Sequence, residues 1–415
     1  MFMDTLRDPC SILDRILPRK YEMNIMITTL IIATAGVFLQ IGGASWDITS
    51  HIMREPETFF TPSHTVLYTG VGLLTIAAGI GSVLLINNKE LKKKSFVTGL
   101  KLLIIGTAIS VIAGPSDFLW HETFGVDGLL SPPHLALITG MLINAVAVVV
   151  GLARIGVHIS VPSKQRLIKL TLIPAFAALW FTTTYYVYMF SLPFSNGENF
   201  QFNLNSSIAV TIAIIALPLL SSLVFVTASK TIGKFGAASA VVVLIVAVNV
   251  FANILPTDGM MISFLPWYLI VAIIPAVTSD IILNNSTVRS KIGEGDSQLI
   301  AGAIIGSMFY IFNYPMLIWA FSIPLDMQLA NLQGIEAITI LTSNFLSTLP
   351  TALAITIVPG ALMGILGAHV SSKKITVRSS TLITRYSRLV TQEEKNDNRG
   401  RYSKISSNNS KIKSE

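Results

Sequence analysis

The sequence predicts an all-α fold, a polytopic transmembrane helical bundle of about ten spans. The first observation is composition: 52% of the 415 residues are hydrophobic, only 12% are charged, and the mean hydropathy is +0.66. Those values do not suit a water-soluble globule. The second is that apolar residues come in runs of roughly 20, the length a helix needs to cross about 30 Å of hydrocarbon. The third is where the positive charges fall between these runs.

The apolar runs divide the chain into ten predicted spans. They lie near residues 23–45, 64–86, 97–115, 134–156, 168–190, 207–228, 236–255, 264–284, 298–321 and 347–370. The first four spans are expected to form two two-helix hairpins within 23–157, and the last six a membrane region within 158–370.

The distribution of Lys and Arg predicts the orientation, because positively charged loops are retained on the cytoplasmic side. With ten spans and the N-terminus inside, Arg54 is the only one of the 29 Lys and Arg residues that falls outside. We therefore expect a multi-pass protein of the cell membrane with both termini cytoplasmic. The lipid bilayer is the main expected partner, and its anionic headgroups account for the net charge of +7. No nucleic-acid partner is expected.

The two ends of the chain are expected to lie outside the bilayer. Residues 1–22 lack the apolar core and cleavage site of a signal peptide, which predicts a short cytoplasmic segment before a retained first span. The single cysteine, Cys10, lies there and can form no intrachain disulfide. Residues 371–415 are basic and contain too few apolar residues to bury a core, so we expect a mostly disordered cytoplasmic tail.

An internal repeat relates the first two spans to the next two. A shift of 70 residues aligns Asp47 with Asp117, His51 with His121, Glu57 with Asp127, Pro62 with Pro132, His64 with His134 and Gly70 with Gly140. Because the shift covers two spans, the copies form a tandem parallel repeat and share one orientation. Both copies therefore place their polar residues on the extracytoplasmic side.

Each copy carries the motif Asp-x3-His-x12-His between two spans. The triplets are Asp47, His51 and His64, and then Asp117, His121 and His134, which together use four of the six histidines. An Asp and a His four positions apart share one helical face. Prolines, such as Pro56 and Pro62 in the first copy, end one helix and begin the next, so the hairpin returns the second His to the first pair. The spacing predicts a three-ligand metal site in each copy.

Two imidazoles and one carboxylate with open positions suit copper, zinc or ferrous iron. Bis-histidine haem fits less well, because its ligands usually project from within spans. The alternative to a metal is a structural, hydrogen-bonded duplication. Adjacent hairpins allow either one shared cluster or two separate sites. Glu57 and Asp127 occupy equivalent loop positions, where they either orient a ligating imidazole or face water.

The motif spacing, with Thr-Pro-Ser-His at 61–64 directly before an apolar helix, resembles the copper-site segment of the C subunit of the membrane-bound methane and ammonia monooxygenases. The resemblance implies copper ligation by the six residues of the two triplets. It also implies an oxidoreductase that uses O2 to hydroxylate a small molecule. It covers only the motif and its flanks in each copy, and the second copy reads Ser-Pro-Pro-His at 131–134.

Two classes of function follow from these motifs. In an enzyme, the metal would serve an oxygenase-like or redox reaction while the helices give a small-molecule substrate an apolar route. In a binding protein, the triplets would capture copper or another divalent ion for uptake, storage or sensing. Transport needs further ligands within the membrane, and the last six spans contain no Cys and no His before His369. Other membrane subunits or a second copy of the chain are the expected protein partners.

Overall fold

The fold is that of a computed structural model. It describes residues 22–52, 58–125, 130–191, 204–257, 265–312 and 356–372, together with Pro350 and Ala354. Throughout this part of the chain the regular secondary structure is helical and no strand occurs, which confirms the predicted all-α class. The chain divides into two compact units, Met1–Ala368 and His369–Glu415. All the contacts given below lie within the first unit.

The first hairpin consists of α2 (Glu22–Ile52) and α3 (Pro62–Asn87). Pro62 stands in the first turn of α3, where the missing N–H has no partner in the helix to lose. At the other end, the N–H of Asn88 donates to the Leu84 carbonyl and closes α3. Two short 3-10 helices, η3 (Leu91–Lys93) and η4 (Ser95–Val97), lead into the second hairpin.

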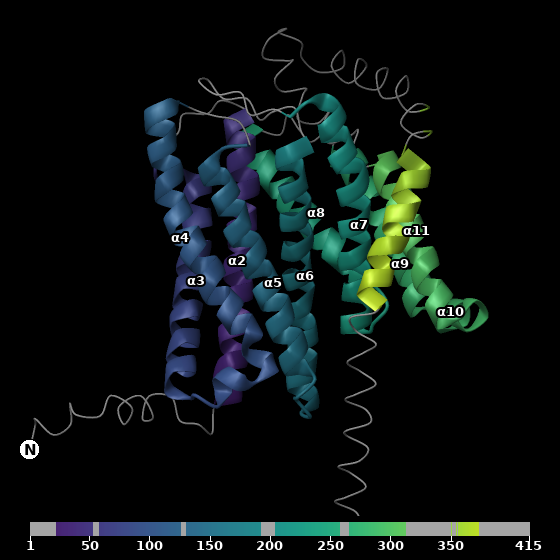
Figure 1. Ribbon diagram of the computed structural model, residues 1–415, viewed down its shortest axis with the longest axis horizontal. Coiled ribbons are helices and arrows are strands. Elements are labelled where there is room, and N and C mark those ends of the chain that lie inside the picture. The colour runs from purple at the N-terminus through teal and green to yellow at the C-terminus, as the bar shows by residue number, and fades with distance from the viewer. Residues whose placement is uncertain are drawn as a thin grey trace, which may run out of the picture. The chain divides into compact units, whose positions relative to one another are not determined.

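The second hairpin consists of α4 (Thr98–Phe124) and α5 (Pro132–Gly156). Helix α4 ends at Gly125, whose φ of 77° favours glycine because a Cβ would be strained there. Ser131 caps α5 by accepting a hydrogen bond from the His134 N–H. The two hairpins pack on each other, with α3 against α4 and α2 against α5 (Figure 1).

Each hairpin crosses at a pair of glycines. In the first, a Cβ added to Gly70 would lie 2.6 Å from the Gly36 carbonyl oxygen. In the second, a Cβ added to Gly140 would lie 3.0 Å from the Gly106 carbonyl oxygen. The crossing glycines thus occupy positions that match under the 70-residue shift.

The contacts between the hairpins are reciprocal. A Cβ on Gly81 of α3 would lie 3.4 Å from the Leu100 side chain of α4, and one on Gly151 of α5 would lie 2.8 Å from the Leu30 side chain of α2. Adding 70 converts Gly81 to Gly151 and Leu30 to Leu100, so the shift exchanges one contact for the other. A two-fold arrangement of equivalent hairpins has this property.

The described helices that follow the hairpins include six that are labelled in Figure 1. They are α6 (Pro162–Ser191), α7 (Ser206–Ile232), α8 (Ala237–Thr257), α9 (Leu265–Asn284), α10 (Ser286–Ile292) and α11 (Glu294–Phe312). Helix α2 joins the hairpins to this region, since it packs on α6 and α8 and the Ser45 hydroxyl donates to Asn249 Oδ1 at 2.8 Å. Helix α11 crosses the helix over Thr356–Ser372 so closely that a Cβ on Gly306 would overlap the Gly360 carbonyl.

Asp280 of α9 is a fully buried carboxylate, 0% exposed. It accepts hydrogen bonds from the backbone N–H groups of Ala238 and Ser239 and from the Ser239 hydroxyl, at 3.1, 2.8 and 2.7 Å. These residues form the first turn of α8, whose unpaired N–H groups attract negative charge. Asp280 therefore caps α8 from the neighbouring helix.

The six helices from α2 to α7 are long and apolar enough to cross a membrane, which makes this a membrane protein. Three shorter apolar helical stretches of 10–17 residues are Ala237–Ala252 within α8, Ile273–Asn284 within α9, and Thr356–Ser372. The predicted spans near 298–321 and 347–370 extend beyond the described residues, and residues 1–21 and 373–415 lie outside them. The count of ten spans and the orientation stay predictions.

Candidate metal centre

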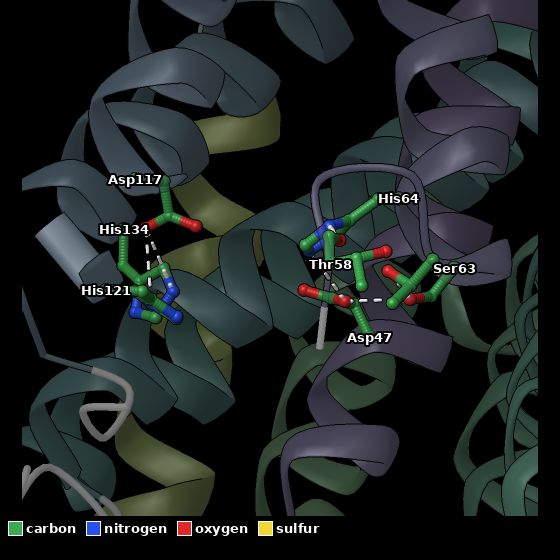
Figure 2. Close-up of polar contacts among 8 residues, drawn as sticks. Asp47, Thr58, Ser63, His64, Asp117, His121 and His134 are labelled. Carbon is green, nitrogen blue, oxygen red and sulfur yellow. Dashed lines mark hydrogen bonds and ion pairs between the residues drawn. The ribbon is translucent and has the colours of Figure 1, made fainter. Parts of the chain in front are cut away.

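Asp117, His121 and His134 of the second hairpin converge on one point (Figure 2). Asp117 Oδ1 lies 3.2 Å from His134 Nε2 and 3.8 Å from His121 Nε2. The two imidazole rings are 5.6 Å apart at their centroids and nearly perpendicular, at 82°. One ligand atom from each of the three residues lies within 4.8 Å of the other two. The structure thus brings this predicted triplet together as a group that could hold a metal ion.

Two helix ends place these three side chains. Asp117 and His121 lie one turn apart near the end of α4, so both point from the same face. Gly125 then ends α4, and Ser131 caps the start of α5, which leaves His134 in the first turn of the returning helix. Figure 2 shows the three side chains turned toward one another. The end of α4 and the start of α5 therefore bring the three side chains of the triplet together.

The second triplet is shielded from solvent. The side chains of Asp117, His121 and His134 are 12%, 7% and 18% exposed, and both Asp117 Oδ1 and His121 Nε2 are buried atoms. A buried carboxylate is costly unless a positive charge compensates it. A cation held between the three groups would provide that compensation.

The spacing of the ligand atoms fits a first-row transition metal. Ligands bound tetrahedrally at about 2.0–2.1 Å from an ion are about 3.3 Å from one another. The Asp117–His134 distance of 3.2 Å is close to this value, and the Asp117–His121 distance is longer, at 3.8 Å. Two imidazole nitrogens and a carboxylate oxygen suit copper, zinc or ferrous iron and leave a further position open.

In the first hairpin, Asp47 and His64 are in direct contact (Figure 2). His64 Nε2 lies 3.0 Å from Asp47 Oδ1, and the Ser63 hydroxyl donates to the same oxygen at 2.8 Å. The Nδ1–H of His64 donates to the Thr58 carbonyl oxygen at 3.0 Å, because a carbonyl can only accept. This bond directs Nε2 at Asp47, which is how ligating histidines are commonly oriented in metal sites.

The structure places the third residue of the first triplet, His51, by its backbone alone. It stands in the last turn of α2, four positions after Asp47, and its side chain lies outside the described residues. Glu57 and Asp127, predicted near the two triplets, also lie outside them. The first site is therefore described through the contact between Asp47 and His64.

The two sets form separate groups, each with its own contacts (Figure 2). Aromatic rings lie between their helices. Phe59 packs edge-on against Phe118, the residue after Asp117, with ring centroids 5.2 Å apart. The Phe59 ring also contacts the Tyr68 ring, with centroids 5.0 Å apart, and the Tyr68 ring lies 5.6 Å from the His64 ring. The contacts of Asp47 are with Ser63 and His64, and those of Asp117 are with His121 and His134.

Two groups that hold the first site were missed by sequence reasoning. Ser63 stands at the start of α3, where a serine hydroxyl usually serves the helix end, yet it binds Asp47 of the preceding helix. The Thr58 group is a backbone carbonyl, so no residue type could have indicated it. The signal available for Ser63 was its place inside the motif, where the second copy carries Pro133.

The chemistry of these sites has to be argued from their own residues. Comparison of this chain with protein-family models, with curated proteins and with solved structures gives no match.

Proposed function

We propose that this integral membrane protein binds copper through its two Asp/His/His sets. The observation that carries the proposal is the convergence of Asp117, His121 and His134, with a carboxylate oxygen 3.2 and 3.8 Å from two imidazole nitrogens. The equivalent site of the first hairpin would use Asp47, His51 and His64. The donor set admits zinc and iron as well, and copper is preferred because the motif resembles the copper-site segment of the membrane monooxygenases.

The two hairpins are, in this proposal, copies of one ancestral unit. The matched glycine crossings and the exchanged contacts of Gly81 with Leu100 and Gly151 with Leu30 support the duplication. With the orientation that the Lys and Arg distribution predicts, both sites face the extracytoplasmic side.

The residues of the second site have three tasks in this function. Asp117, His121 and His134 bind the ion, and their positions on two helix ends keep the donor atoms facing one another. Their burial keeps bulk water away from the site. Bound copper would supply Lewis-acid or one-electron redox chemistry toward a small molecule such as O2, as expected of an oxygenase-like or redox subunit.

A second candidate function is capture of copper or another divalent ion for uptake, storage or sensing, without catalysis. The observation that favours it is the enclosure of the second site, whose three side chains are 7–18% exposed. Such enclosure retains an ion well but restricts the approach of a substrate.

Metal analysis of the purified full-length protein, combined with electron paramagnetic resonance, tests the binding sites. We expect bound copper, and His121→Ala should lose the copper of the second site. A matched control is His158→Ala, because the His158 ring donates from Nδ1 to the Arg154 carbonyl at the far end of α5. Full metal retention in His121→Ala, or equal losses in both variants, would contradict the assignment.

Oxygen consumption and metal uptake separate the two candidate functions. Membranes offered ammonia or short hydrocarbons should consume O2 in a substrate-dependent way that His121→Ala abolishes, if the protein is oxygenase-like. Copper retention or uptake into vesicles, without substrate-dependent O2 consumption, would instead assign capture or storage.

A further inference from the structure

Four buried polar side chains meet between the hairpins, away from both metal sets. They belong to Gln40 of α2, Thr107 and Ser110 of α4 and Asn144 of α5, and each residue is at most 4% exposed. Gln40 and Ser110 each precede the aspartate of their copy by seven positions, which is about 10 Å along a helix. Glycine makes room for this polar cluster, since a Cβ on Gly106 would lie 2.5 Å from Asn144 Oδ1.

The hydrogen bonds within the polar cluster are long. Gln40 Nε2 donates to Ser110 Oγ at 3.3 Å, and Asn144 Nδ2 donates to the same oxygen at 3.5 Å. The Thr107 hydroxyl donates to Asn144 Oδ1 at 3.4 Å. Typical distances are roughly 2.7–3.2 Å for N–H donors and 2.5–3.0 Å for O–H donors. The four side chains therefore lie close together without satisfying one another well.

One atom of the polar cluster, Gln40 Oε1, is buried and accepts no hydrogen bond from the residues that the structure describes. Exchanging the oxygen and nitrogen of this amide does not repair the defect. Oε1 would then accept from Ser110, and Nε2 would be left without an acceptor. In either orientation, Gln40 needs a partner that the described side chains do not supply, and buried polar groups rarely go without one.

We propose that the polar cluster binds one ordered water molecule beside the Gln40 amide. Water both donates and accepts, so it can serve whichever amide atom faces it. Buried waters typically make about three hydrogen bonds, and Ser110 and Asn144 provide the further partners. Ser110 Oγ already accepts two hydrogen bonds, so its own hydrogen is available to donate.

A cation fits this place less well than a neutral molecule. All four side chains are uncharged, so none of them supplies a counter-charge for a cation, and two N–H donors already point at Ser110 Oγ. An ion buried without a counter-charge is far more costly than a buried water. The ligand class is therefore a neutral, water-sized molecule that both donates and accepts hydrogen bonds.

The proposed water lies between the two hairpins, at residues that are equivalent in the two copies. This inference rests on the proposed duplication. Gln40 and Ser110 are 70 residues apart, so they occupy the same position in the two copies, yet they touch each other. Equivalent positions meet only near the axis that relates two copies. The water site therefore occurs once in the molecule, whereas the metal motif occurs twice.

A high-resolution structure of the full-length protein in lipid nanodiscs tests the site directly. The wild type should show a single density peak about 2.7–3.2 Å from the Gln40 amide, and the near-isosteric Gln40→Met should lack it. The copper content should be the same in both proteins. The test of the water site therefore does not depend on whether the protein binds copper. No peak in the wild type would overturn the water, and so would a peak surrounded by five or six oxygens at about 2.4 Å, as for a cation.

The thermal unfolding midpoint of Gln40→Met gives a second test, because a bound water and an empty site predict changes of different sign. If water is bound, Gln40→Met and Ser110→Ala each remove one of its partners and should lower the midpoint. If the site is empty, Gln40→Met removes an unpaired oxygen and the midpoint should stay or rise. Ser116→Ala is the matched control for Ser110→Ala, because the exposed Ser116 hydroxyl donates to the Ile112 carbonyl of its own helix.

Discussion

The Ser63 hydroxyl and the Thr58 carbonyl orient two residues of the first Asp/His/His set, Asp47 and His64. One fixes the Asp47 carboxylate and the other fixes the His64 ring, at 2.8 and 3.0 Å. Groups in such positions typically change metal affinity by about 10–100-fold. The second copy has Pro133 where the first has Ser63, and proline offers no hydroxyl donor. We therefore expect the first set to bind metal more tightly than the second.

Replacing Ser63 tests this difference. In a His121→Ala background, where only the first set remains complete, Ser63→Ala should weaken copper binding by about 10–100-fold, because the carboxylate loses the donor that orients it. Ser63→Thr keeps a hydroxyl and should restore most of the affinity, which a simple packing role would not predict. Competition with a copper chelator measures the affinity, and Ser116→Ala serves as control. An unchanged affinity in Ser63→Ala would remove Ser63 from the site.

At the scale of helices, local spacing was enough to predict part of the site. Asp117 and His121 share a face because they are one turn apart, and a hairpin between two helices must bring His134 back to them. The role of Asp280 could not be predicted in this way, because it caps α8 from α9 and no local spacing encodes that contact. The Ser63–Asp47 hydrogen bond was missed for the same reason, since it joins two helices across the hairpin.

Two glycines of α3 offer a matched test of the first hairpin crossing. A Cβ on Gly70 would lie 2.6 Å from backbone atoms of Gln40 and Gly36, whereas a Cβ on Gly72 would meet nothing within 4 Å. Gly70→Ala should therefore push α2 and α3 apart and destabilise the protein by about 1–3 kcal/mol. Gly72→Ala should be neutral or stabilise by up to about 1 kcal/mol, because alanine favours the helix. Thermal unfolding of the two variants measures the difference, and equal midpoints would contradict the close crossing.

At the scale of the whole molecule, the proposed metal site of each hairpin would join its two helices, so metal binding would be linked to folding. Asp117 and His121 come from α4 and His134 from α5, and a metal held by all three stabilises only the state in which those helices are docked. The first set is expected to link α2 to α3 in the same way.

Metal removal should therefore lower the thermal unfolding midpoint of the purified protein. At a free metal concentration 100 times the Kd, one site contributes about 2.7 kcal/mol. A copper chelator should lower the midpoint by several degrees, and added copper should restore it. The double variant His51→Ala/His121→Ala should respond to neither treatment, because it lacks a ligand in each set. A chelator effect of the same size in that variant would show that the stabilising metal binds elsewhere.

The contact between Ser45 and Asn249 has a consequence for the order in which the chain assembles during synthesis. It joins residues 204 positions apart, so it cannot form until most of the membrane region has been made. Each metal motif, by contrast, closes within a single hairpin, and such short-range contacts form early. In the proposed function, the hairpins would therefore be able to bind metal while α8 is still untranslated, and α2 would contact α8 only afterwards.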